Sequence, residues 1–373
     1  MLCLEDLPVL CNALYDTAAE AVATDRADIV LDVCRQCGML WNAAFESRRV
    51  AYAPGYENSL YGSPTFQRFA ASVCTRLANS YELSGSHIVE IGSGDGRFLV
   101  DLCTCTGSTG LGIDPGYVGP CRPVPSVRIV RQENGIARNE ARLVVIRHVL
   151  EHIGSPRDFL IGVSARCEPA GLLYCEVPNA RGMLQNQAFW DLIYEHPLYF
   201  SSGPLIELLG RCGFSAKRIA SEYDDQFLCL DAVKQFSPVR GMDLDADLNV
   251  VHEFARAFQV TRDLWGERLE AWADQGRRIA LWGIGSKGTA FLSAVGGPFI
   301  DVLVDVNERK HGRYVPVVGR PVNNPAVLSE DSPDLVLVSN PLYLDEIRAE
   351  LEDLGVVAEL VTLWGMEVGS VRT

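Results

Sequence analysis

The chain has 373 residues, of which 48% are hydrophobic and 22% are charged, and its formal net charge is −15. This length accommodates two large domains with buried cores, and the composition excludes a disordered chain. The acidic balance excludes a nucleic-acid partner, which would require clustered Lys and Arg. We expect no membrane partner, and the N-terminus has no signal-peptide pattern, so we expect a cytoplasmic protein whose twelve cysteines are mostly reduced thiols.

Residues 1–60 are expected to form a small zinc-knuckle-like segment of short strands and turns. It contains Cys34 and Cys37, followed by a glycine, and such a turn directs both sulfurs toward one metal ion. These two residues supply only half of a tetrahedral site. Cys3 and Cys11 are the remaining candidates, although their spacing is not that of a knuckle. The alternative is a metal-free segment packed on the main domain.

The next elements are an amphipathic helix over residues 63–83 and a glycine-rich loop over residues 87–96. In this loop a β-favouring run leads to Glu90, three alternate glycines follow, Gly92, Gly94 and Gly96, and a helix begins directly after them. This pattern predicts a buried strand, a tight turn and a helix N-terminus, where α/β sheets bind nucleotide-like ligands. A carboxylate at Glu90 suits a cationic or amine-bearing cofactor.

A second strand ends at Asp114, eighteen residues after Gly96, and its carboxylate can accept both hydroxyls of a ribose. The combination resembles the cofactor site of class I S-adenosylmethionine methyltransferases. This resemblance implies that Glu90 and the glycine loop lie near the methionine part of the cofactor and that Asp114 lies at the ribose. The alternative is a glycine turn in some other α/β domain.

The strand and helix pattern that follows predicts a mostly parallel sheet. Strands are expected over 127–131, 142–146 and 172–177, with a helix from about Pro156. Two further strands near 216–221 and 226–232 are expected to form an antiparallel edge. We therefore predict an α/β fold with a methyltransferase domain over 61–235, followed by a polar helical connector near 236–275.

A second α/β unit begins at Arg277, which predicts a C-terminal Rossmann-like domain over 236–373. Its glycine loop, residues 283–288, is followed by a strand that ends at Asp305, twenty residues after Gly285. This is also the textual form of an NAD site, so an NAD-binding oxidoreductase is a rival function. Lys287 inside the loop argues against NAD, and the first unit is the better match to an adenosyl cofactor.

Three histidines follow strand ends, at the sheet edge where this fold binds its reactants. His148 and His152 follow the fourth strand, and His196 lies in a segment after the fifth. The pKa of histidine suits proton transfer near neutral pH, and a neighbouring glutamate can orient an imidazole. A single histidine is more often structural, but two clusters facing one cofactor predict acid–base chemistry.

Five motifs together resemble the deoxysugar C-methyltransferases over nearly the whole chain. They lie at residues 34–38, 147–152, 194–201, 304–314 and 340–347. The resemblance implies a zinc-bearing N-terminal segment, a central methyltransferase domain and a C-terminal domain that closes over a nucleotide-linked 4-ketosugar. Two departures, a missing first Cys-x-x-Cys and a missing spacer between Tyr194 and Glu195, also suggest a branch whose substrate is not a sugar nucleotide.

The resemblance implies a role for each matching residue. The expected catalytic residues are His152, Tyr194, Glu195, His196 and His148. The expected S-adenosylmethionine-binding residues are Glu90, Gly92, Gly94, Gly96, Asp114, Pro115, Arg147, Tyr56 and Asn58. The expected substrate-binding residues are Glu176, Asn179, Tyr199, Lys287 and Tyr343. Lys287 and Tyr343, with Arg309 and Lys310, would line a diphosphate site; a solvated basic face explains them as well.

The expected reaction is methylation of a carbon next to a ketone in a small-molecule substrate. His196, oriented by Glu195, is the first candidate for the base that makes the enolate, and His152 is the second. Tyr194 or the other histidine would donate a hydrogen bond to the developing oxyanion. The alternatives are O- or N-methylation of a different natural-product scaffold and a non-catalytic binding module.

Overall fold

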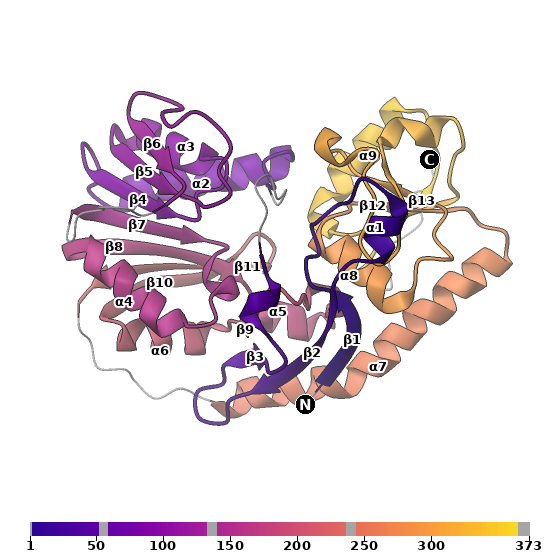
Figure 1. Cartoon of the computed structure of the whole chain (residues 1–373), viewed down its shortest axis with the longest axis horizontal. Helices are drawn as coiled ribbons and strands as arrows, with labels where there is room; N and C mark the ends of the chain where they lie inside the picture. The colour runs from indigo at the N-terminus through magenta and orange to yellow at the C-terminus, as the bar shows by residue number, and fades with distance from the viewer. Residues whose placement is uncertain (1, 52–58, 133–139, 236–243, 365–373) are drawn as a thin grey trace.

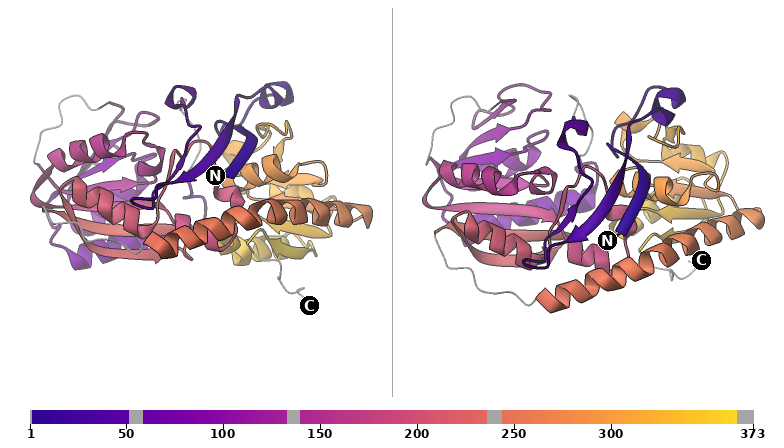
Figure 2. Two further views of the ribbon diagram at one scale, coloured as in Figure 1. Left: turned by 90° about the horizontal axis from the view of Figure 1, so that it is seen from below. Right: turned by 60° about the horizontal axis from the view of Figure 1, so that its bottom comes forward.

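The computed structural model describes residues 2–51, 59–132, 140–235 and 244–364, which form three β-sheets with flanking helices (Figure 1). The two larger sheets lie in separate halves of the molecule, and the N-terminal strands lie between the halves in each view (Figure 2). The predicted α/β class is confirmed. None of the helices in these ranges is both long and apolar enough to cross a bilayer.

The central sheet has the strand order β10-β11-β8-β7-β4-β5-β6. Its strands are β4 (His87–Ile91), β5 (Thr109–Ile113), β6 (Val127–Val130), β7 (Ala141–Arg147), β8 (Cys167–Pro178), β10 (Phe214–Glu222) and β11 (Phe227–Lys234). Strands β4 to β8 are parallel, and β11 is antiparallel to both β8 and β10. The chain therefore turns back between β4 and β7, and this switch point is where open α/β sheets bind ligands.

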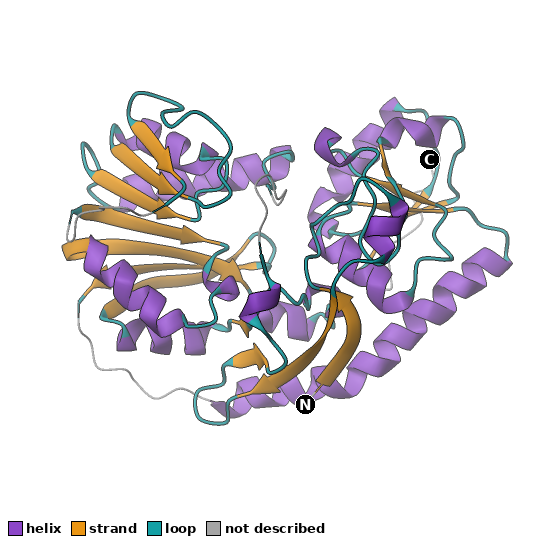
Figure 3. Cartoon of the chain, viewed as in Figure 1, coloured by secondary structure: helices purple, strands orange, loops and turns teal. Residues whose placement is uncertain are grey.

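Helices cover both faces of the central sheet, because successive strand residues point to opposite sides (Figure 3). Ile88 packs with α2 (Pro64–Ser80) and α3 (Arg97–Thr106), whereas its neighbour Val89 packs with α4 (Pro156–Arg166) and α6 (Ser202–Arg211). The remaining helical segments of this half are η2 (Leu150–His152), α5 (Ala180–Gln185) and η3 (Phe189–Asp191).

The C-terminal sheet is parallel throughout and has the order β14-β13-β12-β15-β16. Its strands are β12 (Ile279–Trp282), β13 (Val302–Val304), β14 (Val322–Asn323), β15 (Leu335–Val338) and β16 (Glu359–Thr362). The accompanying helices are α7 (Leu244–Asp274), α8 (Ser286–Val295), η4 (Glu308–Lys310), η5 (Pro325–Ser329), η6 (Pro341–Tyr343) and α9 (Leu344–Asp353). The expected second Rossmann-like unit is present.

The N-terminal sheet combines β1 (Leu2–Pro8), β2 (Arg26–Val33) and β3 (Leu40–Asn42) with β9 (Leu198–Tyr199), a strand from the segment that carries His196. Helix α1 (Ala18–Val22) and η1 (Ser47–Arg49) belong to the same segment. Its buried residues, such as Leu4 and Ile29, share one core with Trp190 and with the C-terminal Phe291. The N-terminal segment is thus packed between the two halves.

The C-terminal half contacts the first turn of α2 through Glu346. Its carboxylate accepts hydrogen bonds from the Thr65 backbone N–H at 2.7 Å and from the Thr65 and Ser63 hydroxyl groups. A carboxylate at this position satisfies an N–H that has no partner inside the helix and complements the helix dipole.

Two more contacts join the halves next to Glu346. Gln226 and Asn340 exchange two side-chain hydrogen bonds of 2.9 and 3.0 Å, and the hydroxyl groups of Tyr223 and Tyr343 lie 3.0 Å apart. We call the three pairs, made by Asn340, Tyr343 and Glu346, the interdomain clasp. The motif at residues 340–347, which resembles the C-terminal domain of the family, is therefore the part of this half that contacts the methyltransferase half.

Replacing the clasp carboxylate should loosen the contact between the halves. Glu346→Ala removes the acceptor of the Thr65 N–H and is expected to lower the free energy of unfolding by about 1–3 kcal/mol in thermal or denaturant unfolding. Glu352→Ala on the same helix is the control, because Glu352 is exposed. Equal stability of the two variants would contradict a structural role for the Glu346 contact.

Candidate active site

The glycine loop lies at the carboxyl end of β4, at the switch point of the central sheet. Gly92, Gly94 and Gly96 all have positive φ values, of 74°, 53° and 81°. A Cβ atom at Gly96 would lie 2.2 Å from Ile129 Cδ1, whereas a Cβ atom at Gly94 would meet no atom within 4 Å. Gly92 and Gly96 are therefore required by the fold, and Gly94 faces the open side where a ligand can approach.

Asp114 follows β5 at the same edge and holds the glycine loop. Its two carboxylate oxygens accept hydrogen bonds from the Gly94 and Gly116 backbone N–H groups, each at 2.8 Å. Each oxygen keeps a lone pair for a further donor. Pro115 is exposed beside it. This geometry fits the expected role of Asp114 at a ribose.

Glu90 ends the strand below the loop and is only 2% exposed. Burial raises the pKa of its carboxyl group to about 8, and the nearby charge of Arg147 partly opposes this shift. Glu90 Oε2 and Ser93 Oγ are buried and make no hydrogen bond with the protein. Two polar atoms without partners beside an open glycine fit a bound ligand that carries an amine, as S-adenosylmethionine does.

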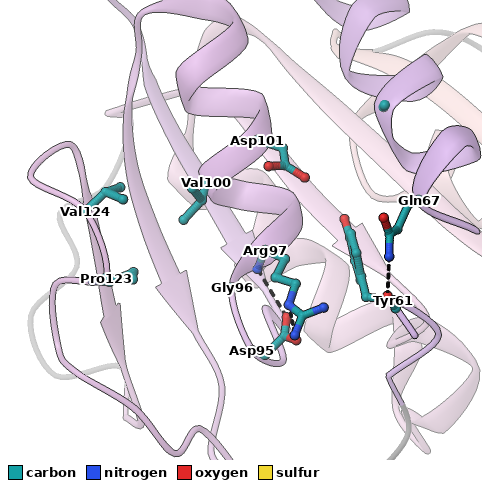
Figure 4. Close-up of a pocket in the computed structure, with 10 residues that line it drawn as sticks. Tyr61, Gln67, Asp95, Gly96, Arg97, Val100, Asp101, Pro123 and Val124 are labelled. Atoms are coloured by element: carbon teal, nitrogen blue, oxygen red, sulfur yellow. Dashed lines mark hydrogen bonds and ion pairs between the residues drawn. The ribbon is translucent and has the colours of Figure 1, made fainter. Parts of the chain in front are cut away.

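A hollow of about 560 Å³ adjoins the loop along α3 (Figure 4). Tyr61, Gly96 and Arg97 line it, together with Pro123 and Val124. Glu90 and Asp114 are not among its lining residues. The hollow therefore lies on the α3 side of the glycine loop.

Arg147 and Glu176, expected at the cofactor and the substrate, form a buried ion pair instead. Arg147 Nη2 lies 2.9 Å from Glu176 Oε1, and its guanidinium group stacks 4.1 Å from the Phe98 ring centroid. Glu176 Oε2 accepts a 2.6 Å hydrogen bond from the Tyr174 hydroxyl. The carboxylate of Glu176 is fully buried and already has protein donors, so it positions the end of the sheet.

His148 lies between two carboxylates. Its Nε2 lies 3.0 Å from Glu176 Oε1, a close ion pair without hydrogen-bond alignment, and its Nδ1 lies 3.5 Å from Glu151 Oε1. Burial lowers the pKa of His148, but the interactions with Glu151 and Glu176 outweigh it and raise the pKa to about 9. His148 is therefore an imidazolium at neutral pH, which makes it unsuitable as the base.

His152 and His196 form a pair, with ring centroids 4.6 Å apart and planes at 77°. His152 Nδ1 lies 3.0 Å from the Glu195 carbonyl oxygen, and because a carbonyl only accepts, Nδ1 carries the proton. Burial above all lowers the pKa of His196 well below its usual value, and the nearby His152, His148 and Lys287 lower it further. His196 is therefore neutral at neutral pH, as a base must be.

Tyr194 and Glu195, expected to act in catalysis, anchor the N-terminal segment. The Tyr194 hydroxyl accepts a hydrogen bond from the Glu46 N–H at 2.8 Å, and its ring packs on Phe45. Glu195 Oε2 accepts a hydrogen bond from the Cys11 N–H at 2.8 Å. The expectations that Tyr194 donates to an oxyanion and that Glu195 orients His196 are not what this geometry favours, because both groups are buried and have backbone partners.

Tyr199 and Asn179 also have internal partners. The Tyr199 hydroxyl donates to the Ile193 carbonyl oxygen at 2.9 Å. Asn179 caps α5, and its amide donates to Ser221 and to the Asp225 carbonyl oxygen. Both side chains are thus held by hydrogen bonds within the protein, and their contact with a substrate stays a prediction.

The second glycine loop is occupied by protein groups. Asp305 accepts from the Ile284 N–H at 2.8 Å and from Lys310 Nζ at 2.9 Å, and Lys287 forms an ion pair with Asp191. The carboxylate that would bind an NAD ribose is therefore already paired, which disfavours the NAD alternative. Lys287 and Lys310 likewise have anionic partners, so a free diphosphate site at these lysines is disfavoured.

The N-terminal cysteines do not assemble a four-ligand site among the described residues. Cys34 and Cys37 lie in the turn between β2 and β3, where Cys34 and Met39 are joined by a 2.8 Å backbone hydrogen bond. Cys11 is buried beside Glu195, and Cys3 is exposed on β1. Two sulfurs do not complete a zinc site. Tyr56 and Asn58 lie outside the described residues.

Two glycine variants should separate folding from ligand binding. Gly96→Ala places a methyl group against Ile129 and is expected to lower the free energy of unfolding by about 2–4 kcal/mol. Gly94→Ala meets no atom, so it should cost only about 1 kcal/mol while weakening adenosylhomocysteine binding in calorimetry. If Gly94→Ala binds adenosylhomocysteine as tightly as the parent protein does, the ligand does not approach the loop at Gly94.

Two family descriptions match the chain. One, a methyltransferase domain, covers residues 65–217, and the other, a C-methyltransferase C-terminal domain, covers residues 240–358. The C-methyltransferase NovU of Streptomyces niveus is 27% identical over 288 residues, and the match covers 70% of this chain and 68% of NovU.

Solved methyltransferase structures match parts of the chain. The S-adenosylmethionine-dependent enzyme from Mesorhizobium loti has a TM-score of 0.37 and 15% identity, covering 44% of this chain and 97% of that one. The enzyme from Aquifex aeolicus has a TM-score of 0.36 and 14% identity, covering 47% and 95%.

The two family matches cover the glycine loop of the central sheet and, in the C-terminal half, strands β12 to β15 with the clasp residues Asn340, Tyr343 and Glu346. They agree with the relationship to NovU and confirm the resemblance to sugar C-methyltransferases that the five motifs indicated. These matches identify the protein as an S-adenosylmethionine-dependent methyltransferase that is similar to the sugar C-methyltransferases.

Proposed function

We propose that the protein methylates a carbon next to a ketone, on a nucleotide-linked keto-deoxysugar or a related natural-product intermediate. The observation that carries this proposal is the His152–His196 pair, in which His196 is held neutral near the carboxyl edge of the cofactor-binding sheet. Carbon is a poor nucleophile until its proton is removed, and a neutral imidazole is the group that removes it. The similarity to NovU, a C-methyltransferase, supports the same reaction type.

His196 takes the proton from the α-carbon, and the electron pair of the C–H bond moves through the carbon to the ketone oxygen, giving an enolate. When bound, S-adenosylmethionine supplies the electrophilic methyl group. The enolate carbon would form the new C–C bond as the methyl–sulfur bond of the cofactor breaks, with adenosylhomocysteine as the leaving group. The ketone is restored, and His196 returns its proton to solvent. The imidazolium of His148 contributes positive charge that stabilises the developing oxyanion.

O- or N-methylation remains the second candidate, because an imidazole could equally deprotonate a hydroxyl group. The clasp favours a carbon-methylating site, because it holds the C-terminal half against the methyltransferase half and an enolate needs a site that is closed to water. Incorporation of a ¹³C-labelled methyl group distinguishes the reactions, since the carbon chemical shift differs between C-, N- and O-methyl products.

The base is tested by His196→Asn with a nucleoside-diphosphate 4-keto-deoxysugar in deuterated water. We expect exchange of the substrate α-proton, followed by NMR, to fall by at least about a hundredfold, while adenosylhomocysteine binding is retained. His252→Asn is the control, because His252 is exposed on α7. Undiminished exchange in His196→Asn would remove His196 from the mechanism, and loss in His152→Asn alone would make His152 the base.

Binding of the methyl donor should release a proton from Glu90. Its carboxyl group, with a pKa of about 8, is protonated at neutral pH without ligand, and a cationic ligand favours the carboxylate. At pH 7 close to one proton should therefore leave, and none above pH 9. Calorimetry in two buffers of different ionisation enthalpy measures this release. Glu90→Gln should bind more weakly and show no buffer dependence; a persistent dependence would point to another group.

A further inference from the structure

We propose that Glu151 is the positioning carboxylate of the base pair, orienting His152 and His196 and supplying the counter-charge when they take up the substrate proton. This inference rests on the proposed function and assigns the acidic residue that assists the proposed base. The sequence motif Arg-His-x-Leu-Glu-His contains Glu151, but nothing in the spacing distinguishes it from the more conspicuous Glu195.

The geometry around Glu151 supports this role. Glu151 lies in η2, one residue before His152, and is 2% exposed. Donor or acceptor atoms of Glu151, His152 and His196 all lie within 4.8 Å of one another. Glu151 Oε1 faces His148, while the buried Oε2 makes no hydrogen bond with the protein. The unpartnered oxygen thus belongs to the carboxylate that lies against both imidazoles.

The carboxylate of Glu195 accepts the Cys11 N–H through Oε2, so this side chain anchors the N-terminal segment. Glu195 contributes to the pair through its carbonyl oxygen, which accepts the Nδ1 proton of His152. The backbone of Glu195 sets the tautomer of one histidine, and the side chain of Glu151 is available to both.

The charges around the pair show why a counter-ion is needed. His196 faces His152, the imidazolium of His148, the ammonium of Lys287 and the ring of Tyr199. Lys287 is paired with Asp191, and His148 is shared with Glu176. A proton taken up by His196 would therefore join an already cationic neighbourhood, and Glu151 supplies the negative charge beside it.

An unpartnered oxygen on a buried carboxylate costs free energy in the resting protein. Protonation of the pair creates a new N–H that can turn to this oxygen, and movement of about 1–2 Å would bring the groups into hydrogen-bond distance. Proton transfer from the substrate then gives Glu151 the donor that it lacks. The arrangement favours the protonated state of the pair, and thus the enolate.

The same three side chains could also hold a divalent cation, since two imidazoles and a carboxylate are common ligands. The imidazolium of His148 lies 3.5 Å from Glu151, and Arg147 is nearby through Glu176, so a dication would enter a site that already contains two positive groups. These charges favour the proton-accepting role, and a metal centre becomes an outcome of the test.

The experiment compares Glu151→Gln and Glu151→Asp in the complete protein with the substrate class used above. Glu151→Gln is expected to lower kcat at least about tenfold and leave both KM values within about twofold. An anionic neighbour raises the pKa of an imidazolium, so its loss should move the acid limb of the kcat–pH profile down by about one pH unit. Glu151→Asp, which keeps the charge, should restore the position of the limb and part of kcat.

Glu195→Gln is the matched control, also buried, and should lower the unfolding temperature without moving the acid limb. Calorimetric binding of adenosylhomocysteine reports whether each variant is folded, and Glu151→Ala serves as the charge-free variant if Glu151→Gln does not fold. An unchanged kcat with an unchanged limb in a folded charge-free variant overturns the inference.

Two further outcomes are decisive. Activity that is lost after chelation and restored by Zn²⁺ or Mn²⁺ would replace the positioning role with a metal centre, whereas full activity in a chelator supports it. If Glu151→Gln behaves as the parent while His196→Asn is inactive, only this inference fails. If His196→Asn keeps α-proton exchange, the proposed function itself fails.

Discussion

The active site depends on one buried charge cluster at the ends of β7 and β8. Glu176 is fully buried and is matched by the guanidinium of Arg147, the imidazolium of His148 and the hydroxyl of Tyr174. Removing one partner from such a cluster leaves an uncompensated charge and typically costs about 3–5 kcal/mol. The cluster fixes where β7 ends and holds His148 in a left-handed conformation, with φ of 51°. The turn that carries Glu151 and His152 starts from that residue.

A second constraint comes from the N-terminal segment, which packs between the halves. The Tyr-Glu-His motif packs against this segment. Tyr194 accepts a hydrogen bond from the Glu46 N–H, and Glu195 accepts one from the Cys11 N–H. Strand β9, which follows the motif, completes the N-terminal sheet. His196 is the member of this run whose side chain reaches the other histidine. Two of the three polar residues of this motif, Tyr194 and Glu195, thus anchor the segment that carries the His196 imidazole.

Local signals predicted the fold well, and they brought the candidate cofactor residues to one edge of the central sheet. The glycine loop, Asp114 and the β-strands are encoded in residues that are close in sequence, where strand period, positive φ and helix start leave direct traces. The partners of Tyr194, Glu195 and Glu176 could not be predicted in this way, since they are chosen by packing between segments far apart in sequence. Spacing in the sequence identified the titratable residues. Which imidazole is neutral, His196, and which carboxylate has an oxygen without a partner, Glu151, depends on the charges that the fold brings together.

The interdomain clasp connects this chemistry to motion. The proposed enolate formation would require a site closed to water, whereas substrate entry and product release require an open one. The clasp is built from side-chain hydrogen bonds, Gln226 with Asn340 and Tyr223 with Tyr343, and water can replace each of these when the halves separate. Its net cost of opening is therefore far smaller than that of an apolar interface of equal extent. Tyr343 packs against the cores of both halves. A contact with this composition can close over a substrate and open again, while the shared core of the N-terminal segment keeps the halves joined.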